Sequence, residues 1–146
     1  MSPARVETLR DVYAHWAEGD FAAGWDLYDE HIVLVLRSEF PEAGPHYGRD
    51  AIRDYMRNDF LRDFAGATIS GEEFIDAGDS VLVRVDQRAS GPRSGVPVRM
   101  RYYQVWTFRG DRVIRIESIM ERADALKAVG LANGSWSRRG VTTARA

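Results

Sequence analysis

The sequence predicts a single α+β domain: a cone-shaped roll in which a curved antiparallel sheet and N-terminal helices packed on its concave face enclose one pocket. Helical periodicity dominates the first 64 residues, and period-two alternation fills residues 67–120. A chain of 146 residues fits one domain with one core. We expect residues 1–131 to form this domain and residues 132–146, which lack periodicity, to form a flexible C-terminal tail.

Composition argues against several classes of partner and site. The chain has no cysteine, so disulfides and thiolate metal sites are absent. Its net charge of −2 gives no global attraction for nucleic acid or anionic lipid. No apolar run is long enough to cross a bilayer, and the start shows no signal-peptide pattern. We therefore expect a cytoplasmic protein with neither nucleic-acid nor membrane partners.

The first helix is predicted to begin at Ser2 and Pro3, a capping hydroxyl followed by the residue that suits the first helical turn. Its apolar face carries Val6, Leu9, Tyr13 and Trp16. Gly19 ends it, and Asp20 is expected to cap a second, short helix. That second helix would carry Phe21, Trp25 and Tyr28 on one side.

A short buried strand is expected over Ile32–Leu36, followed by a loop over Ser38–Gly48 that holds two Pro and two Gly. Asp50 is expected to cap the third helix. Four apolar residues recur there at intervals of four, namely Ile52, Met56, Phe60 and Phe64. The remaining strands are predicted over 67–75, 80–89, 96–108 and 113–120, with hairpin turns between them and a closing helix over 122–129.

Strand alternation assigns two faces to this sheet, because successive side chains point to opposite sides. The inward set is mainly apolar and comprises Val81, Val83, Val85, Gln87, Val98, Met100, Tyr102, Gln104, Trp106, Phe108, Ile114, Ile116, Ser118 and Met120. Only Gln87, Gln104 and Ser118 in this set are strongly polar. They either orient a ligand or satisfy one another and the buried backbone.

Inward strand residues and helical aromatics together predict the wall of a pocket for a small apolar molecule. The predicted ligand-binding residues are Trp16, Tyr55, Phe60, Val85, Gln87, Met100, Tyr102, Gln104, Trp106, Ile116 and Ser118. The alternative for the aromatic residues is plain core packing, which such stripes usually provide.

The opposite face carries alternating charges. Its basic residues are Arg84, Arg88, Arg99, Arg101 and Arg115, and its acids are Asp86, Glu117 and Glu121. One interpretation is a solvated face with cross-strand ion pairs. The interpretation we favour is a homodimer interface, because Tyr103, Val105 and Ile119 lie among the charges and aromatic residues and Arg are enriched at interfaces.

The order of several segments resembles that of a known family. These segments are Trp16–Asp20, Tyr47–Ile52, Phe74–Asp79, Val105–Val113 and Arg122–Leu126. No single one is specific, but the ordered set, spread over residues 5–131, is similar to the SnoaL-like branch of the nuclear transport factor 2-like superfamily. The resemblance implies a cone-shaped α+β fold with a pocket and, usually, a homodimer through the outer sheet face. Polyketide cyclases, ketosteroid isomerases, epoxide hydrolases, dehydratases and non-catalytic binders share this shell, so the fold does not decide function.

The catalytic groups of those relatives do not carry over. The epoxide-hydrolase-like members place Tyr, Asn, Arg and two Asp at positions that match Leu34, Leu36, Val85, Gln87 and Ser118. The ketosteroid-isomerase-like members place Tyr and two Asp at positions that match Val12, Leu36 and Gln104. A one-residue shift of the alignment would instead bring in Tyr13, Asp86 or Glu117, against the face assignment above.

An acid–base enzyme needs a titratable group inside the pocket, so the remaining candidates lie elsewhere. The candidate catalytic residues are His46 at the end of the Pro/Gly-rich loop, Asp59 on the third helix, and Gln104 as a carbonyl-polarising amide. A structural role is the alternative for both His46 and Asp59. Arg37 can pair with a ligand carboxylate or with Glu39. The three His are scattered, so we expect no metal, and no cofactor motif is present.

Three functions fit these observations. The first is a dimeric binding protein for an apolar, polycyclic or terpenoid-like molecule. The second is a cofactor-independent isomerase, cyclase or dehydratase acting on a polyketide-, steroid- or terpenoid-like substrate. The third is a pure association module, for which the chain offers no second domain.

Overall fold

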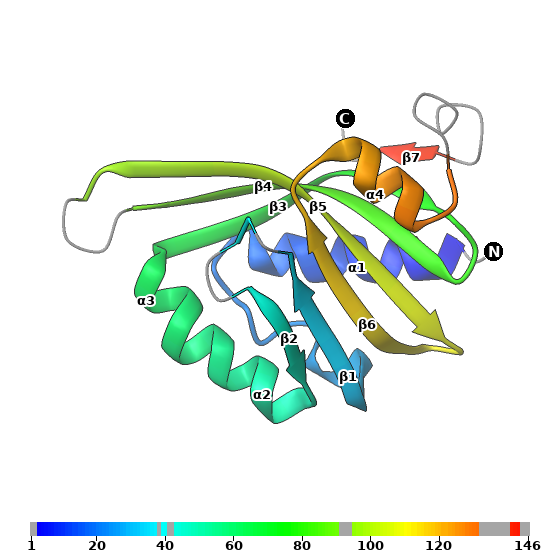
Figure 1. Cartoon of the computed structure of the whole chain (residues 1–146), viewed down its shortest axis with the longest axis horizontal. Coiled ribbons are helices and arrows are strands. Elements are labelled where there is room, and N and C mark those ends of the chain that lie inside the picture. Colours follow the sequence, from blue (N-terminus) through cyan, green and yellow to red (C-terminus); the bar gives the residue numbers. More distant parts are fainter. Residues whose placement is uncertain (1–2, 38, 41–42, 91–94, 132–140, 144–146) are drawn as a thin grey trace.

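The computed structural model describes residues 3–37, 39–40, 43–90, 95–131 and 141–143. Its strands form one curved mixed sheet in the order β2-β1-β6-β5-β4-β3-β7 (Figure 1). The strands are β1 (Tyr28–Leu36), β2 (Gly44–Tyr47), β3 (Ala65–Asp76), β4 (Ser80–Ser90), β5 (Pro97–Arg109), β6 (Arg112–Ile119) and β7 (Val141–Thr143).

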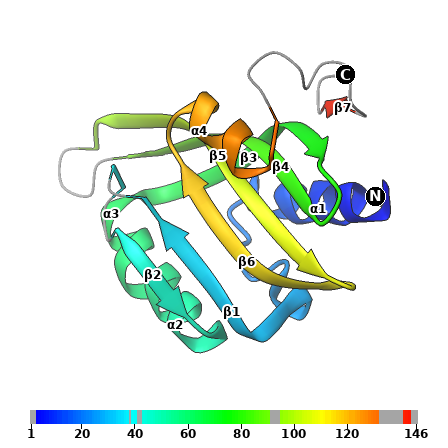
Figure 2. The same cartoon turned by 45° about the vertical axis from the view of Figure 1, so that its right-hand side comes forward.

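The helices divide between the two sides of this sheet. They are α1 (Pro3–Trp16), the 3-10 helix η1 (Trp25–Leu27), α2 (Arg49–Asp54), the π-helix η2 (Tyr55–Phe60), α3 (Leu61–Asp63) and α4 (Arg122–Ala128). Helix α1 and the continuous α2–η2–α3 segment lie against the concave face, and α4 lies on the opposite, outer face (Figure 2). The α+β class and the enclosing arrangement of helices and sheet are confirmed.

One strand pairing differs from the antiparallel sheet that was predicted. Strand β1 pairs with β6 in parallel, with Leu36 opposite Ser118, while the other neighbours are antiparallel. A parallel pair needs a long crossover connection. Here the α2–η2–α3 segment and four strands, β2, β3, β4 and β5, separate β1 from β6 in the chain. This crossover brings the α2–η2–α3 segment over the concave face.

The predicted loop over 38–48 contains a strand that sequence reasoning missed. Residues Gly44–Tyr47 form β2 and pair antiparallel with β1 at the edge of the sheet. An edge strand tolerates Pro45, because one side of it needs no ladder hydrogen bonds.

The second helix predicted after Asp20 forms only as the short 3-10 helix η1, Trp25–Leu27. Asp20 Oδ1 instead accepts a hydrogen bond from the backbone N–H of Ala22 at 3.2 Å, and the chain turns into η1. Gly24 stands at φ 94°, a left-handed conformation that a helix cannot continue. A Cβ at Gly24 would also lie 3.2 Å from Val12 of α1. Phe21 therefore reaches the core from a turn, and Trp25 reaches it from η1.

Alternation assigned the inward faces of β4 and β5 correctly. On β6 the prediction was wrong at the start of the strand: Val113 is fully buried in the concave-face core, and Ile114 is only partly buried. The β5–β6 register shifts between Thr107 and Phe108. A bulge of this kind changes which side chains face inward, and the predicted pattern is restored at Ile116 and Ser118.

Helix α4 covers the apolar part of the outer face. Ala125 and Leu126 of α4 pack on a cluster that includes Leu82, Val105 and Ile119. Two of the residues that favoured a dimer interface, Val105 and Ile119, are therefore buried within the same chain. A short amphipathic helix such as α4 is stable only when its apolar face packs against apolar side chains like these.

The described part of the predicted tail is one short strand, β7, which pairs antiparallel with β3. Residues 132–140 and 144–146, including Trp136, lie outside the described residues. The flexible tail otherwise stays a prediction.

Candidate functional site

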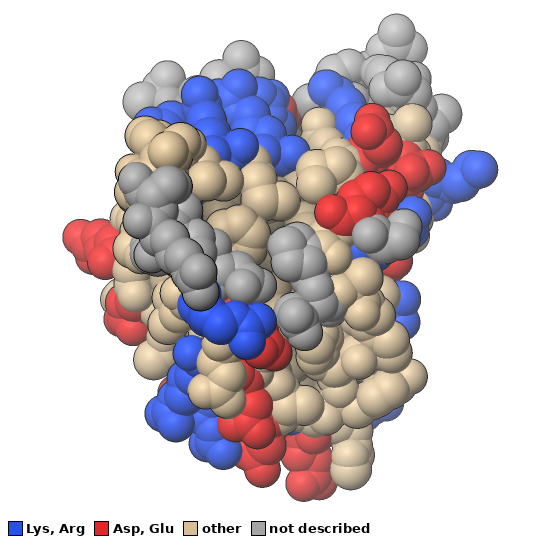
Figure 3. Space-filling view, turned by 60° about the vertical axis from the view of Figure 1, so that its left-hand side comes forward, with Lys and Arg blue, Asp and Glu red and all other residues tan. Residues whose placement is uncertain are grey.

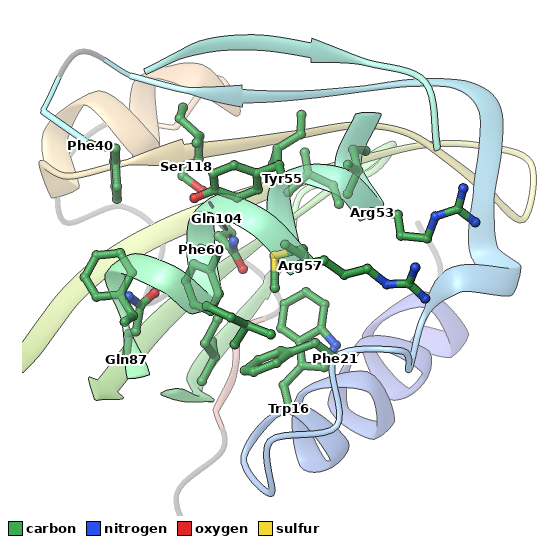
Figure 4. Close-up of a pocket in the computed structure, with 18 of the residues that line it drawn as sticks. Trp16, Phe21, Phe40, Arg53, Tyr55, Arg57, Phe60, Gln87, Gln104 and Ser118 are labelled. Carbon is green, nitrogen blue, oxygen red and sulfur yellow. Dashed lines mark hydrogen bonds between the residues drawn. The ribbon is translucent and has the colours of Figure 1, made fainter. Parts of the chain in front are cut away.

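A cavity of about 400 Å³ lies between the concave face of the sheet and the α2–η2–α3 segment. Its wall is mainly apolar and includes nine aromatic side chains, namely Trp16, Phe21, Trp25, Tyr28, Phe40, Tyr55, Phe60, Phe64 and Tyr102. Figure 4 shows Gln104 and Ser118 near the middle of the site, Gln87 at one end, and Arg53 and Arg57 at the other. Its volume and its few polar groups suit a small organic molecule.

The helical part of the wall follows from an apolar spacing of four. In an α-helix a step of four residues advances by about 40°, so a stripe at this spacing drifts away from the core. The π-helix η2 adds wider turns, which reduce that drift. As a result the whole stripe, Ile52, Met56, Phe60 and Phe64, stays on the cavity together with Tyr55. π-Turns are frequent at functional sites.

A buried hydrogen-bond chain runs from the core to the cavity wall. Trp106 Nε1 donates to the Tyr13 hydroxyl at 2.9 Å. The Tyr13 hydroxyl in turn donates to Gln104 Oε1. Gln104 Nε2 then donates to Ser118 Oγ at 3.3 Å, across the β5–β6 ladder. Gln104 and Ser118 line the cavity, whereas Tyr13 and Trp106 stand behind them.

A second tyrosine–glutamine pair lies further along the same sheet. The Tyr102 hydroxyl donates to Gln87 Oε1 at 2.6 Å. Gln87 Nε2 lies 3.8 Å from the Met100 sulfur. The side-chain carbonyl oxygens of Gln104 and Gln87 therefore each accept a hydrogen bond from a tyrosine hydroxyl.

Burial disfavours the ionisation of three tyrosines in or beside the cavity wall, Tyr13, Tyr28 and Tyr102. Burial raises the pKa of Tyr13 well above its usual value, and the hydrogen bond from Trp106 only partly offsets this. Burial likewise raises the pKa of Tyr28 and of Tyr102 beyond any physiological pH. These hydroxyls therefore act as hydrogen-bonding groups rather than as acids or bases near neutral pH.

The charged groups of the described wall are two arginines at one end. Arg53 pairs with Asp50 at 2.9 Å and lies over the Trp25 ring at 5.5 Å. Arg57 is exposed and has no ion-pair partner among the described residues. Arginine stays charged throughout the accessible pH range. None of the described wall residues is Asp, Glu or His.

Nine of the eleven predicted ligand-binding residues line the cavity: Trp16, Tyr55, Phe60, Gln87, Met100, Tyr102, Gln104, Ile116 and Ser118. The structure places the other two, Val85 and Trp106, in the packed core beside the cavity, where both are fully buried. Helix α1 fills the space over this part of the sheet. Tyr13 and Trp16 pack their rings on Trp106, with centroids 5.9 and 5.7 Å from it.

Two of the three predicted catalytic residues lie outside the described wall. His46 is on the edge strand β2, with its ring 4.9 Å from that of Tyr55, which stands at the wall. Asp59 is on η2, partly exposed, and pairs with Arg62 at 3.4 Å. Their catalytic roles stay untested predictions, but neither side chain borders the cavity. Only Gln104 does.

The residues that a one-residue shift of the family-based alignment would bring in lie in different places. Val12 and Tyr13 are both buried, and the Tyr13 hydroxyl reaches the cavity residue Gln104. On the strands, Asp86 and Glu117 pair with outer-face arginines rather than facing the cavity.

Ion pairs cover the rest of the outer face. Asp86 accepts from Arg99 Nε at 3.0 Å and from Arg88 Nε at 3.1 Å. Burial alone would raise the pKa of Asp86, but the hydrogen bonds from Arg99 and Arg88 outweigh it and hold the pKa below its usual value. Arg84 donates to Glu73 Oε1 at 2.7 Å. Figure 3 shows basic side chains gathered near the top of that view and mixed charges elsewhere.

Arg37 belongs to this charged face and not to the cavity. Its Nε donates to Glu117 Oε2 at 2.9 Å, a partner that differs from the predicted Glu39. Within the described ranges, no three His, Asp or Glu side chains gather to hold a metal ion. None of the helices in the described part of the chain has the length and apolar character that spanning a bilayer requires.

Sequence reasoning missed part of the wall for identifiable reasons. Trp25 and Tyr28 were placed on one helix, whereas Trp25 lies on η1 and Tyr28 begins β1. Phe40 was placed in a loop, where it packs against Tyr102 with ring centroids 5.1 Å apart. Arg53 and Arg57 carry no apolar signal. Their spacing of four, in step with the apolar stripe, is the signal that could have placed them beside the cavity.

Comparison with known proteins identifies the family. The SnoaL-like domain family matches residues 9–116, which is most of the chain. The protein therefore belongs to the SnoaL-like family, with the nuclear transport factor 2-like fold. None of the curated proteins matches it.

Several solved structures share the fold at low sequence identity. A nuclear transport factor 2-like protein of unknown function from Burkholderia pseudomallei K96243 has a TM-score of 0.70 and 18% identity, over 89% of this chain and 99% of that one. A putative SnoaL-like polyketide cyclase from Jannaschia sp. CCS1 has a TM-score of 0.68 and 16% identity, over 88% and 95%. TerC, co-crystallised with polyporic acid, has a TM-score of 0.68 and 19% identity, over 86% and 97%.

Proposed function

We propose that this SnoaL-like protein binds a small, mainly apolar molecule in the cavity without transforming it. The observation that carries the proposal is the absence of Asp, Glu and His from the described wall. Burial raises the pKa of two wall tyrosines, Tyr28 and Tyr102, which disfavours their ionisation near neutral pH. An apolar wall with a few oriented polar groups binds and selects a ligand but supplies no proton donor or acceptor for turnover.

A ligand screen with a blocked variant tests this proposal. Fluorene, larger polycyclic hydrocarbons and ketones, and polyporic acid form the panel, with binding followed by calorimetry and native mass spectrometry. Leu36→Trp places an indole in the cavity wall, and we expect it to weaken binding at least about tenfold. Arg115→Trp adds the same group to the outer face and should bind like the wild type. If no panel member binds the wild type, or if Leu36→Trp binds unchanged, the proposal fails.

The second candidate is a cofactor-independent isomerase, cyclase or dehydratase acting on a polyketide-, steroid- or terpenoid-like substrate. Its support is the pair of adjacent wall donors, Gln104 and Ser118, which could stabilise an oxyanion. His46 and Asp59 would then have to reach the substrate by a movement or through water. The test is turnover of enone and polyketide substrates, with a loss of about a hundredfold expected in Gln104→Ala. Rates unchanged in both Gln104→Ala and His46→Ala would contradict this assignment.

We also propose a cytoplasmic homodimer formed through the part of the outer face that α4 leaves uncovered. Forked arginine donors and carboxylates alternate there beside Tyr103. Such a charged interface would weaken with salt. Analytical ultracentrifugation should show a dimer at low salt that dissociates as salt rises, and a monomer at all salt concentrations would contradict the proposal.

A further inference from the structure

Arginines follow the border of the apolar stripe on the α2–η2–α3 segment. Arg49, Arg53 and Arg57 recur at intervals of four, each in step with the stripe that contains Ile52 and Met56. Arg53 and Arg57 line the cavity, and Figure 4 shows their side chains extending toward the same end of it. This end of the cavity therefore carries positive charge, whereas none of the described wall residues is Asp or Glu.

Arg53 is held in place by two contacts. Its Nη2 donates to Asp50 Oδ1 at 2.9 Å, and its guanidinium carbon lies 5.5 Å from the centroid of the Trp25 ring. Arg49 lies over the same ring at 5.6 Å. The Arg53 side chain is nevertheless 43% exposed, and a guanidinium has five N–H donors. Donors of Arg53 therefore remain for a ligand, on a group whose position is already set.

Arg57 has no partner among the described residues, and this sets it apart from the other arginines in those ranges. Each of the others has an ion pair, a hydrogen bond, a ring contact or another electrostatic interaction. Arg57 is exposed and lines the cavity. A guanidinium that pairs with no carboxylate of the described chain can bind one that belongs to a ligand.

The rest of the described wall disfavours a negative charge elsewhere in the cavity. A carboxylate near the middle, beside Gln104, would lose its hydration without a cation to offset that loss. At the other end, the exposure of Arg53 and Arg57 shows that the cavity opens to solvent there. A carboxylate at that opening would keep part of its hydration and gain forked N–H donors.

From this asymmetry we infer that the cavity takes an amphipathic carboxylic acid, with an apolar ring body among the aromatic side chains and a terminal carboxylate at Arg57 and Arg53. The inference deepens the proposed function and rests on it. The two oxygens of a planar carboxylate match the paired N–H groups of a guanidinium. Arg57 determines the charge selection, and Arg53 is a second donor that Asp50 and Trp25 hold in position.

Two probes of nearly the same shape test the charge selection: fluorene-2-carboxylate, which is ionised near neutral pH, and fluorene-2-carboxamide, which is neutral. By calorimetry at low salt we expect the wild type to bind the carboxylate at least about fivefold more tightly than the carboxamide. The preference should shrink as salt rises, because ions screen an exposed pair of charges.

A substitution at Arg57 assigns the preference to this residue. Arg57→Gln removes the charge at an exposed helical position and keeps a good helix former. Carboxylate affinity should fall at least about fivefold, while carboxamide affinity stays within about twofold. Arg109→Gln makes the same change in net charge at a residue whose side chain is 74% exposed and lies outside the described wall. It should bind both probes like the wild type.

The outcomes separate this inference from the function beneath it. If the wild type binds the carboxamide as tightly as the carboxylate, the charge selection is overturned and binding remains. Carboxylate affinity that is unchanged in Arg57→Gln, or that falls equally in Arg109→Gln, would overturn the site at Arg57. Binding of fluorene but of neither probe would also overturn the inference. If fluorene and both probes fail to bind, the proposed function falls and this inference falls with it.

Discussion

Adjacent residues of β4 and β5 face two different chemical environments. On β4, Val85 is fully buried and Gln87 accepts a hydrogen bond from Tyr102 at the cavity. Asp86, between them, faces the other way and accepts a hydrogen bond from the outer-face residue Arg99. The concave face holds neutral polar groups that satisfy one another. The outer face holds full charges that pair with one another. The strand period of two keeps these sets apart, so every charge on β4 and β5 is directed away from the cavity.

This contrast explains why the fold does not imply catalysis here. A carboxylate in the cavity would need partners to offset its desolvation, and the described wall supplies only the two arginines at one end. The arginines of the sheet are instead committed to outer-face acids, as in the Arg84–Glu73 pair at 2.7 Å. The described cavity wall therefore offers neutral polar groups and two arginines, and none of its residues is Asp, Glu or His.

The largest expected change in the free energy of unfolding comes from placing a charged side chain on the inner face of the sheet. Val85→Asp would bury an unpaired carboxylate at a fully buried position, so it should lower the free energy of unfolding by about 4 kcal/mol or more, or prevent folding. Thr107→Asp introduces the same group on the outer face opposite Arg115 and should change stability by less than about 1 kcal/mol. Urea unfolding measures both. Similar losses in the two variants would mean that the faces do not differ as described.

A smaller effect is expected from neutralising the outer-face carboxylate that is most enclosed. Asp86→Asn removes the acceptor charge for Arg88 and Arg99 and should cost about 2 kcal/mol at pH 7. Because the pKa of Asp86 is lowered on folding, its contribution is present above the unfolded pKa of about 3.9 and is lost as pH falls through the folded value. The wild-type and variant stabilities should therefore differ by a constant amount above about pH 5 and converge below about pH 4. A difference that persists at acid pH would show that Asp86 acts by packing alone.

The smallest expected effect is the pH dependence of stability that comes from the inner-face tyrosines. Burial raises the pKa of Tyr13, Tyr28 and Tyr102, so these phenols should stay protonated in the folded protein while free tyrosine ionises near about pH 10. Since the folded pKa values are raised, the stability that they contribute is full below the unfolded pKa and declines as pH rises above it. Absorbance titration should show that Tyr13, Tyr28 and Tyr102, at least, ionise only with unfolding. Ionisation of these residues before unfolding would contradict the enclosed, neutral inner face.

Much of this contrast could be predicted from the sequence, because alternation is a local property. Alternation of successive residues along β4 and β5 assigns each side chain to the inner or the outer face. The apolar stripe of the third helix identifies the side of that helix that lines the cavity. The β6 error at Val113 arose from a bulge, which the sequence pattern does not reveal. The contact between Tyr13 and Gln104 joins residues 91 positions apart, so only the packing of α1 on the sheet reveals it. Strand β2 was missed because Pro and Gly favour a loop unless a neighbouring strand supplies the ladder.

A crystal structure with fluorenone bound tests the central claim most directly. The account predicts the ligand inside the cavity, in contact with Trp16 and Phe60, with its oxygen roughly 3 Å from Gln104 Nε2 or Ser118 Oγ. A ligand bound only on the outer face, or a cavity filled by the protein's own side chains, would contradict it.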